Sequence, residues 1–275
     1  MAARTWLMAA CVLVMAGALA GRPSQTSPPL SERLALAPQS RARFGIDEPL
    51  TLTLPIGLPA ATVARSVTAP CPVRVTRLSA VRYHILPRGF WPGQRAIHLR
   101  LHLEQLGPAW PWPVPSLQDT LRTGAAVAVY VSLTTQEMAV YQGDQLLRVI
   151  PVSTGSWPRF VTPTGRFYIF RRVRVETMSG GTPGTADYYR VQQVPYSQYI
   201  FGGVAIHGAW WSNAFGVPRS HGCIQLPTQT HNPEPEGVQE EAGWLWSVTS
   251  LGTPVTVTGS TPHVVTTPIR YPAGR

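Results

Sequence analysis

Two histidines and a cysteine lie close together in the C-terminal part of the sequence, on either side of a loop that contains Gly, Pro and Asn. His207 is followed by Gly208. Cys223 stands 16 positions after His207 and is preceded by His221 and Gly222. A thiol attacks a carbonyl carbon as its thiolate, and an adjacent imidazole can take the thiol proton and later return it to a leaving amine. These residue types therefore predict acyl transfer on a cysteine.

The residues just before Cys223 are suited to forming a tight turn around the sulfur. Gly222 removes a side chain where a substrate carbonyl must come close, and it permits backbone geometry that aims N–H groups at a developing oxyanion. We expect Ser220 and His221 to brace this turn. On an extended segment His221 and Cys223 share a face, whereas His207 needs the fold to bring it to the sulfur. The spacing alone leaves open which histidine is the base.

The elements that must position these residues are expected to be mainly strands. Charged residues make up 13% of the chain and hydrophobic residues 44%, which excludes a disordered polyelectrolyte and allows a buried core. The 28 Pro and 24 Gly residues interrupt long helices repeatedly. A mainly β fold follows.

The net charge of +10 reflects 23 basic and 13 acidic residues, and every one of the 23 is arginine because the sequence contains no lysine. Such a charge suits anionic polymers, including nucleic acids, acidic lipids and bacterial wall polymers. The arginines are scattered, and the densest group is Arg171, Arg172 and Arg174. We therefore expect no nucleic-acid partner.

The first 20 residues are typical of a signal peptide or an N-terminal anchor. Arg4 precedes an apolar run over 6–19, and Ala18-Leu19-Ala20 has the form of a cleavage site. The run is shorter than a membrane span needs, so a cleaved leader is favoured over a retained anchor, which would be the chain's contact with a membrane. Export predicts an extracytoplasmic protein, secreted or associated with the cell wall or membrane.

Cys71 and Cys223 would then share a compartment in which disulfides form, but the residues around Cys223 favour a free thiol.

The mature chain is expected to contain two β-rich units. Residues 21–43 form a flexible linker, rich in Pro, Ser, Gln and Arg. Over 44–120, short alternating runs such as 50–54 and 97–103 predict a small β-sandwich. Over 121–259, the runs 127–131, 137–141 and 146–150 predict a meander with a polar turn at 142–144, and 252–258 predicts a last strand. Residues 260–275 form a tail rich in Pro and Thr.

Both units resemble parts of known wall enzymes. The segment 83–93, with Phe90-Trp91-Pro92-Gly93, is similar to a bacterial immunoglobulin-like module that often precedes a catalytic domain. His-Gly, a mid-length loop and Ser-His-Gly-Cys resemble the L,D-transpeptidase catalytic family, also called YkuD-like. Further matches in the same order are 152–155, 162–165, Gly202-Gly203, Gly216 and 252–255.

This resemblance implies a role for each catalytic residue. Cys223 would be the nucleophile, and His207 the general base, oriented by the backbone carbonyl of Gly208. His221 would form the oxyanion environment together with the N–H groups of Gly222 and Cys223. The implied reaction cleaves the terminal D-alanine from a peptidoglycan tetrapeptide stem, holds the stem as a thioester and passes it to an acceptor amine. No metal or organic cofactor is implied, and carbapenem-type inhibitors are expected to acylate the thiol.

The residues expected to bind substrate are Ser220, Gln225, Tyr199, Trp210 and Trp211. Gln225 departs from the family pattern, because the position two after the cysteine is usually Arg or Asn. This departure keeps open the alternative of a catalytically inactive wall-binding protein.

A zinc-dependent wall peptidase is a second alternative. Zinc could be bound by His207, His221, Cys223 and His231, which are suitable ligands. The sequence lacks a Cys-x2-Cys or His-Glu-x2-His pair, so this alternative is less favoured.

Overall fold

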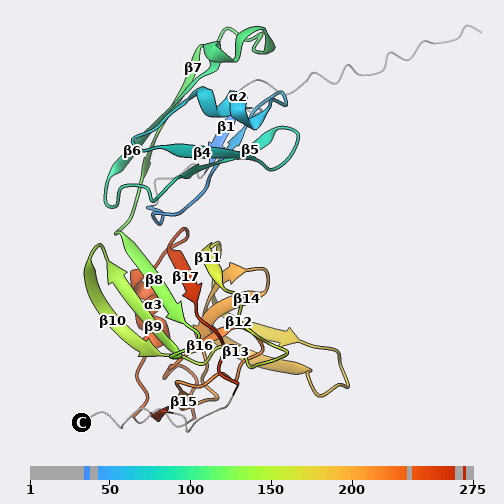
Figure 1. Ribbon diagram of the computed structural model, residues 1–275, viewed down its shortest axis with the longest axis vertical. Coiled ribbons are helices and arrows are strands. Elements are labelled where there is room, and N and C mark those ends of the chain that lie inside the picture. Colours follow the sequence, from blue (N-terminus) through green and yellow to red (C-terminus); the bar gives the residue numbers. More distant parts are fainter. Residues whose placement is uncertain (1–33, 38–42, 234–236, 264–268, 271–275) are drawn as a thin grey trace, which may run out of the picture.

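The computed structural model describes residues 34–37, 43–233, 237–263 and 269–270. The predicted leader and most of the predicted linker lie outside the described residues. The described chain is built mainly from strands, as expected, and forms two successive units with separate hydrophobic cores (Figure 1). Within the described residues, no helix is both long enough and apolar enough to cross a membrane.

The first unit is a sandwich of a four-stranded and a three-stranded sheet. The four-stranded sheet has the order β1 (Ala35–Ala37), β2 (Leu50–Thr53), β5 (Arg82–Pro87), β4 (Val73–Arg77). The other sheet has the order β3 (Val67–Thr68), β6 (Ala96–His102), β7 (Ser116–Arg122). Helix α2 (Ala60–Arg65) and the 3-10 helix η1 (Leu103–Ala109) complete the unit. All paired strands of the unit are antiparallel.

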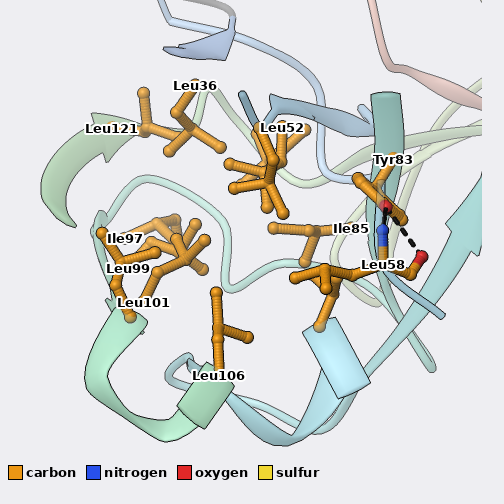
Figure 2. Packing of buried hydrophobic residues seen from close by; sticks show 14 of the residues in the cluster. Leu36, Leu52, Leu58, Tyr83, Ile85, Ile97, Leu99, Leu101, Leu106 and Leu121 are labelled. Carbon is orange, nitrogen blue, oxygen red and sulfur yellow. Dashed lines mark hydrogen bonds between the residues drawn. The ribbon is translucent and has the colours of Figure 1, made fainter. Parts of the chain in front are cut away.

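The core of the sandwich receives alternate side chains from both sheets, because successive side chains of a strand point to opposite faces. In β6, Ile97, Leu99 and Leu101 are buried while His98 between them is exposed. Figure 2 shows Ile97, Leu99 and Leu101 facing Leu52 and Ile85 of the other sheet. The immunoglobulin-like class of this sandwich stays a prediction.

The sandwich ends slightly later than the sequence suggested. Leu121 is buried in the first core, and β7 runs to Arg122. The hydroxyl of Thr123 donates to the Pro92 carbonyl at 2.6 Å. The boundary therefore lies near residue 124 rather than at 120, since β7 completes the three-stranded sheet.

The second unit contains a five-stranded and a four-stranded sheet around the second core. The five-stranded sheet has the order β10 (Gln145–Pro151), β9 (Glu137–Gln142), β8 (Val127–Ser132), β17 (Pro254–Thr258), β11 (Gly165–Tyr168). The four-stranded sheet has the order β12 (Arg171–Gly180), β13 (Tyr189–Phe201), β14 (Val204–Gly208), β16 (Ile224–Leu226). Helix α3 (Glu241–Val248) contributes Leu245 to this core. The predicted meander is present as β8, β9 and β10.

The chain after residue 259 is partly packed against the second unit. Strand β18 (Ile269–Arg270) pairs with β15 (Ala214–Phe215). The rings of His263 and Trp157 stack with centroids 4.2 Å apart. The part of the predicted tail that the structure describes is therefore in contact with the second unit.

Backbone hydrogen bonds and the ion pair between Arg166 and Asp47 join the two units. Gly45 N–H donates to the Leu251 carbonyl at 2.6 Å, and Asp47 N–H to the Gly252 carbonyl at 2.8 Å. A Cβ on Gly252 would lie 2.4 Å from the Cβ of Glu48, and its φ of +78° favours glycine. The junction therefore depends on close approach of the two backbones.

Candidate active site

The parallel pairing of β14 and β16 brings the two halves of the sequence motif together. Ile206 lies opposite Ile224, and His207 opposite Gln225. Cys223 directly precedes β16, so it reaches the strand that carries His207. Both residues line one pocket of about 360 Å³. The fold thus brings His207 and Cys223 together, which their spacing in the sequence alone could not establish.

His207 is held in one orientation by the backbone. Its side chain is 3% exposed, and Nδ1 lies 2.9 Å from the Gly208 carbonyl oxygen. A carbonyl oxygen only accepts hydrogen bonds, so the proton is on Nδ1 and Nε2 is left as a proton acceptor. Burial lowers the pKa of His207, although the Gly208 hydrogen bond and the negative charge of Glu176 act in the opposite direction. The resting imidazole is therefore neutral.

The thiol of Cys223 is half-buried and is unpaired, as is that of Cys71. Its Sγ lies 3.9 Å from the Gly203 carbonyl oxygen. Burial raises the pKa of the Cys223 thiol, the Ala205 N–H lowers it, and Glu176 raises it. A neutral thiol beside a neutral imidazole can pass its proton to Nε2 as the sulfur attacks.

The turn before Cys223 is braced by Ser220, as expected. The Ser220 hydroxyl donates to the Cys223 carbonyl, and Gly222 N–H donates to the Ser220 Oγ at 3.1 Å. Gly222 has a φ of +116°, a conformation that favours glycine. Ser220 thus accepts the Gly222 N–H in this structure, and the oxyanion role of Gly222 stays a prediction.

The two upstream motifs, 152–155 and 162–165, pack against this turn. The Thr162 hydroxyl donates to the Gly222 carbonyl and accepts from Gly155 N–H, both at 2.9 Å. A Cβ on Gly155 would lie 1.8 Å from the Phe160 carbonyl oxygen and 2.9 Å from the Gly222 Cα. Residues 152–155 and 162–165 are therefore a packed support for the turn that carries Cys223.

Aromatic rings surround His221 on the pocket rim. The His221 ring centroid lies 4.4 Å from that of Phe160 and 4.7 Å from that of Tyr189. Burial raises the pKa of the Tyr189 hydroxyl, and the neighbouring Cys223 raises it further. His221 is thus fixed between two rings while it lines the pocket.

The two tryptophans occupy different positions. Trp211 lines the pocket, with its ring centroid 5.8 Å from that of His207. Trp210 lines a neighbouring pocket together with His231, and its Nε1 donates to the Gln192 carbonyl at 3.1 Å. Trp211 also lines that second pocket, so its ring is part of the wall between them.

Tyr199 does not line the pocket, contrary to the sequence prediction. It pairs with Ala205 in the β13–β14 ladder, and its hydroxyl donates to a Glu176 carboxylate oxygen at 2.8 Å. Arg171 covers the Tyr199 ring at 3.8 Å and lies 3.7 Å from the same carboxylate. Tyr199 therefore holds Glu176, whose charge acts on both His207 and Cys223.

Several pocket residues were not found from the sequence. They come from the β12–β13 hairpin and from the loop after β14: Met178, Tyr189, Val191, Ser212 and Arg219. Arg219 adds a positive charge to a pocket that also contains Gln225. Its place directly before Ser220 was the one signal that could have identified it.

No group of three or more His, Cys, Asp and Glu side chains in the described residues is arranged to hold a metal ion. Among the four zinc ligands considered, His231 lines the neighbouring pocket rather than the one that contains Cys223. The geometry therefore offers a thiol–imidazole pair.

Comparisons with known proteins give a family match and several similar folds. Residues 126–257 match the family model of the YkuD L,D-transpeptidase catalytic domain. No curated protein matches the chain significantly.

Among solved structures, an L,D-transpeptidase from Mycobacterium smegmatis has 24% identity and a TM-score of 0.65, covering 82% of this chain and 98% of that chain. L,D-transpeptidase 3 from Mycobacterium tuberculosis, in complex with a faropenem-derived adduct, has 24% identity and a TM-score of 0.64. This match covers 82% of this chain and 97% of that chain. The L,D-transpeptidase LdtMt1 in complex with imipenem has 23% identity and a TM-score of 0.63, covering 82% and 98%. These likenesses show that both units share the fold of those proteins.

Proposed function

Residues 126–257 are an L,D-transpeptidase catalytic domain of the YkuD family, and from this premise we propose that the enzyme links peptidoglycan stems through a thioester on Cys223. The observation that carries this proposal is the buried His207, whose Nε2 is left as a proton acceptor in the pocket of Cys223. The substrate implies that the enzyme acts where the wall polymer lies, outside the cytoplasmic membrane.

The first half-reaction forms the thioester. The Cys223 Sγ attacks the carbonyl carbon of the bond to the terminal D-alanine, while its proton moves to His207 Nε2. His221 and the Cys223 N–H stabilise the oxyanion. The carbon–nitrogen bond then breaks, and the amine of D-alanine leaves with the proton from His207.

The second half-reaction restores the thiol. An acceptor amine attacks the thioester carbonyl and loses a proton to His207. The carbon–sulfur bond breaks and the thiolate takes this proton back. Another stem is the acceptor in wall cross-linking.

Arg219 offers a counterpart for the negative charge of the stem. The position of Gln225 commonly carries Arg or Asn in this family, and here a guanidinium enters the same pocket from the preceding loop. We assign to Arg219 the binding of the terminal carboxylate of the donor stem, and to Gln225, Trp211 and Tyr189 contacts with its peptide. This arrangement favours an active enzyme over an inactive wall-binding protein.

Intact-mass analysis with a carbapenem tests the proposal, because the strained β-lactam carbonyl resembles the bond that is cleaved. The structures of two similar proteins contain imipenem and a faropenem-derived adduct. We expect one added drug mass on the unmutated protein, lost in Cys223→Ala and kept in Cys71→Ala. Cys71 is a suitable control, because it packs against the core of the first unit and lies outside the pocket that contains His207 and His221. With a tetrapeptide stem, release of D-alanine should follow the same pattern.

No adduct on a reduced, folded protein would favour the inactive wall-binding alternative. Loss of D-alanine release on chelation, with recovery on addition of Zn²⁺, would favour the peptidase alternative.

A further inference from the structure

A second concave site lies at the junction of the two units, away from Cys223. It is a cleft of about 680 Å³, and it shares no lining residue with the active-site pocket. Arg74 of β4 and Arg88 line it from the first unit, and Arg166 and Tyr168 of β11 line it from the second. Three arginines from separate segments thus converge on one cavity, which neither unit forms alone.

One of these arginines is already neutralised. The Arg166 guanidinium donates to both carboxylate oxygens of Asp47, at 3.0 and 3.3 Å, and to the Gly89 carbonyl at 2.9 Å. It also stacks on Phe90, with Cζ 4.3 Å from the ring centroid. Asp47 is the acidic residue of the lining, and Arg166 occupies both of its oxygens. Arg166 is therefore a fixed structural contact.

The other two guanidinium groups are free to bind a ligand. Arg74 and Arg88 are exposed, and no carboxylate in the described part of the chain lies within ion-pair distance of either. Burial raises the pKa of Asp47, and the charges of Arg166 and Arg74 act in the opposite direction, so Arg74 interacts with Asp47 at longer range. They line the cleft beside Leu86, Pro87 and Tyr168, which provide aliphatic and aromatic surface. The cleft thus combines two guanidinium groups that form no close ion pair with apolar walls, and its volume is in the usual range for small-ligand sites.

We propose that this junction cleft binds a carboxylate-bearing peptide stem of the wall polymer, distinct from the stem that is acylated. Carboxylates separated by short aliphatic groups match two guanidinium groups beside apolar walls, since a guanidinium binds a carboxylate through paired hydrogen bonds. Asp47 limits the excess charge of the cleft, which suits carboxylates better than a repeating phosphodiester. The inference rests on the proposed function only in naming the polymer.

Calorimetric titration of Cys223→Ala protein with a soluble disaccharide tetrapeptide tests this site, because that substitution prevents turnover. We expect two binding sites per chain. In the same background, Arg74→Gln/Arg88→Gln should leave binding at the active site unchanged. Binding at the junction cleft should weaken at least about fivefold, the effect expected of losing two exposed ion pairs. The matched variant Arg100→Gln/Arg122→Gln removes the same charge from exposed positions outside the cleft and should retain both sites.

Chemical variants of the probe identify the ligand. A tetrapeptide with amidated carboxylates should lose the cleft site, whereas inorganic phosphate and a phosphodiester wall polymer should compete only weakly. Stem binding that is unchanged by Arg74→Gln/Arg88→Gln, equal losses in the two double variants, or full binding of the amidated probe would overturn the proposal. Displacement by the phosphodiester polymer at lower concentration than by the stem would assign the cleft to phosphate instead.

Carbapenem acylation separates this inference from the proposed function. With Cys223 present, both double variants should be acylated at rates within about twofold of the unmutated protein, because the cleft shares no residue with the active-site pocket. Absence of acylation in all three proteins would refute the proposed function but leave the stoichiometry test of the cleft intact. Unchanged thermal unfolding would show that the variants are folded.

Discussion

Replacement of Glu48 by glutamine should make the protein more stable at alkaline pH. Glu48 lies at the junction of the two units against Gly252, and its buried Oε2 has no hydrogen-bond partner among the described residues. Burial raises the pKa of Glu48 from 4.5 to about 7. The folded protein therefore holds this proton in a range where the unfolded chain has lost it, so stability falls as pH rises from about 4.5 through 7.

The size of the effect follows from the difference between the two pKa values. Each pKa unit corresponds to about 1.4 kcal/mol, so the full loss is about 3 kcal/mol above pH 8. The substituted glutamine would have nearly the shape of the protonated Glu48 side chain and would carry no charge at any pH. The two proteins should thus be similarly stable near pH 4.5, and Glu48→Gln should be the more stable by about 3 kcal/mol at pH 8.5, or about 6–12 °C in Tm.

Thermal unfolding followed by circular dichroism from pH 4.5 to 8.5 provides the measurement. Asp47, Arg166 and Tyr168 lie at the same junction, and His207 titrates elsewhere in the fold, but these groups are common to both proteins and largely cancel in the difference. Glu137→Gln, at an exposed position of β9, controls for the loss of one carboxylate. Parallel pH curves for the unmutated protein and Glu48→Gln, or a difference that is largest at low pH, would refute the reasoning.

Three further predictions concern the active site. His207→Ala should slow carbapenem acylation about 10²–10⁴-fold, the usual loss for a general base, and a larger loss in His221→Ala would reverse their roles. Arg219→Gln should raise KM for a tetrapeptide stem about tenfold with little change in kcat, since it removes a charged partner of the substrate, whereas Arg190→Gln in the neighbouring pocket should change KM less than twofold in steady-state assays. Glu176→Gln removes a charge that raises the pKa of both members of the thiol–imidazole pair, so the pH profile of acylation should move to lower pH, and an unchanged profile would contradict the electrostatic role.

The sequence was informative where chemistry and local pattern coincide. Alternating apolar residues predicted the sandwich strands and the β8–β10 meander, because each such strand has one buried face. The motif around Cys223 pointed to the pocket, and Gly222 and Ser220 form the turn that carries Cys223.

The remaining site residues depend on pairing between distant strands. Tyr189 and Glu176 enter the site through the register of the β12–β13 hairpin, which contains bulges that no local pattern specifies. The prediction that Tyr199 lines the pocket failed for the same reason. Its pairing with Ala205 decides on which face of the sheet its side chain lies. The Glu48–Gly252 contact joins residues about 200 positions apart, so its raised pKa had no signature in the sequence.

The parallel β14–β16 ladder separates catalytic geometry from loop length. The pairing of β14 with β16 sets the register between His207 and the segment that carries Cys223, while residues 209–219 connect the two strands. This connection lines the pocket through Trp211 and Arg219, and its second half is held by β18 and by residues 152–154. Insertions in its first part, 209–213, can therefore change the pocket wall at Trp211 without changing the register of His207 and Cys223. For engineering, residues 209–213 are the natural segment to exchange when a different pocket wall is wanted, since Cys223 and His207 stay in register.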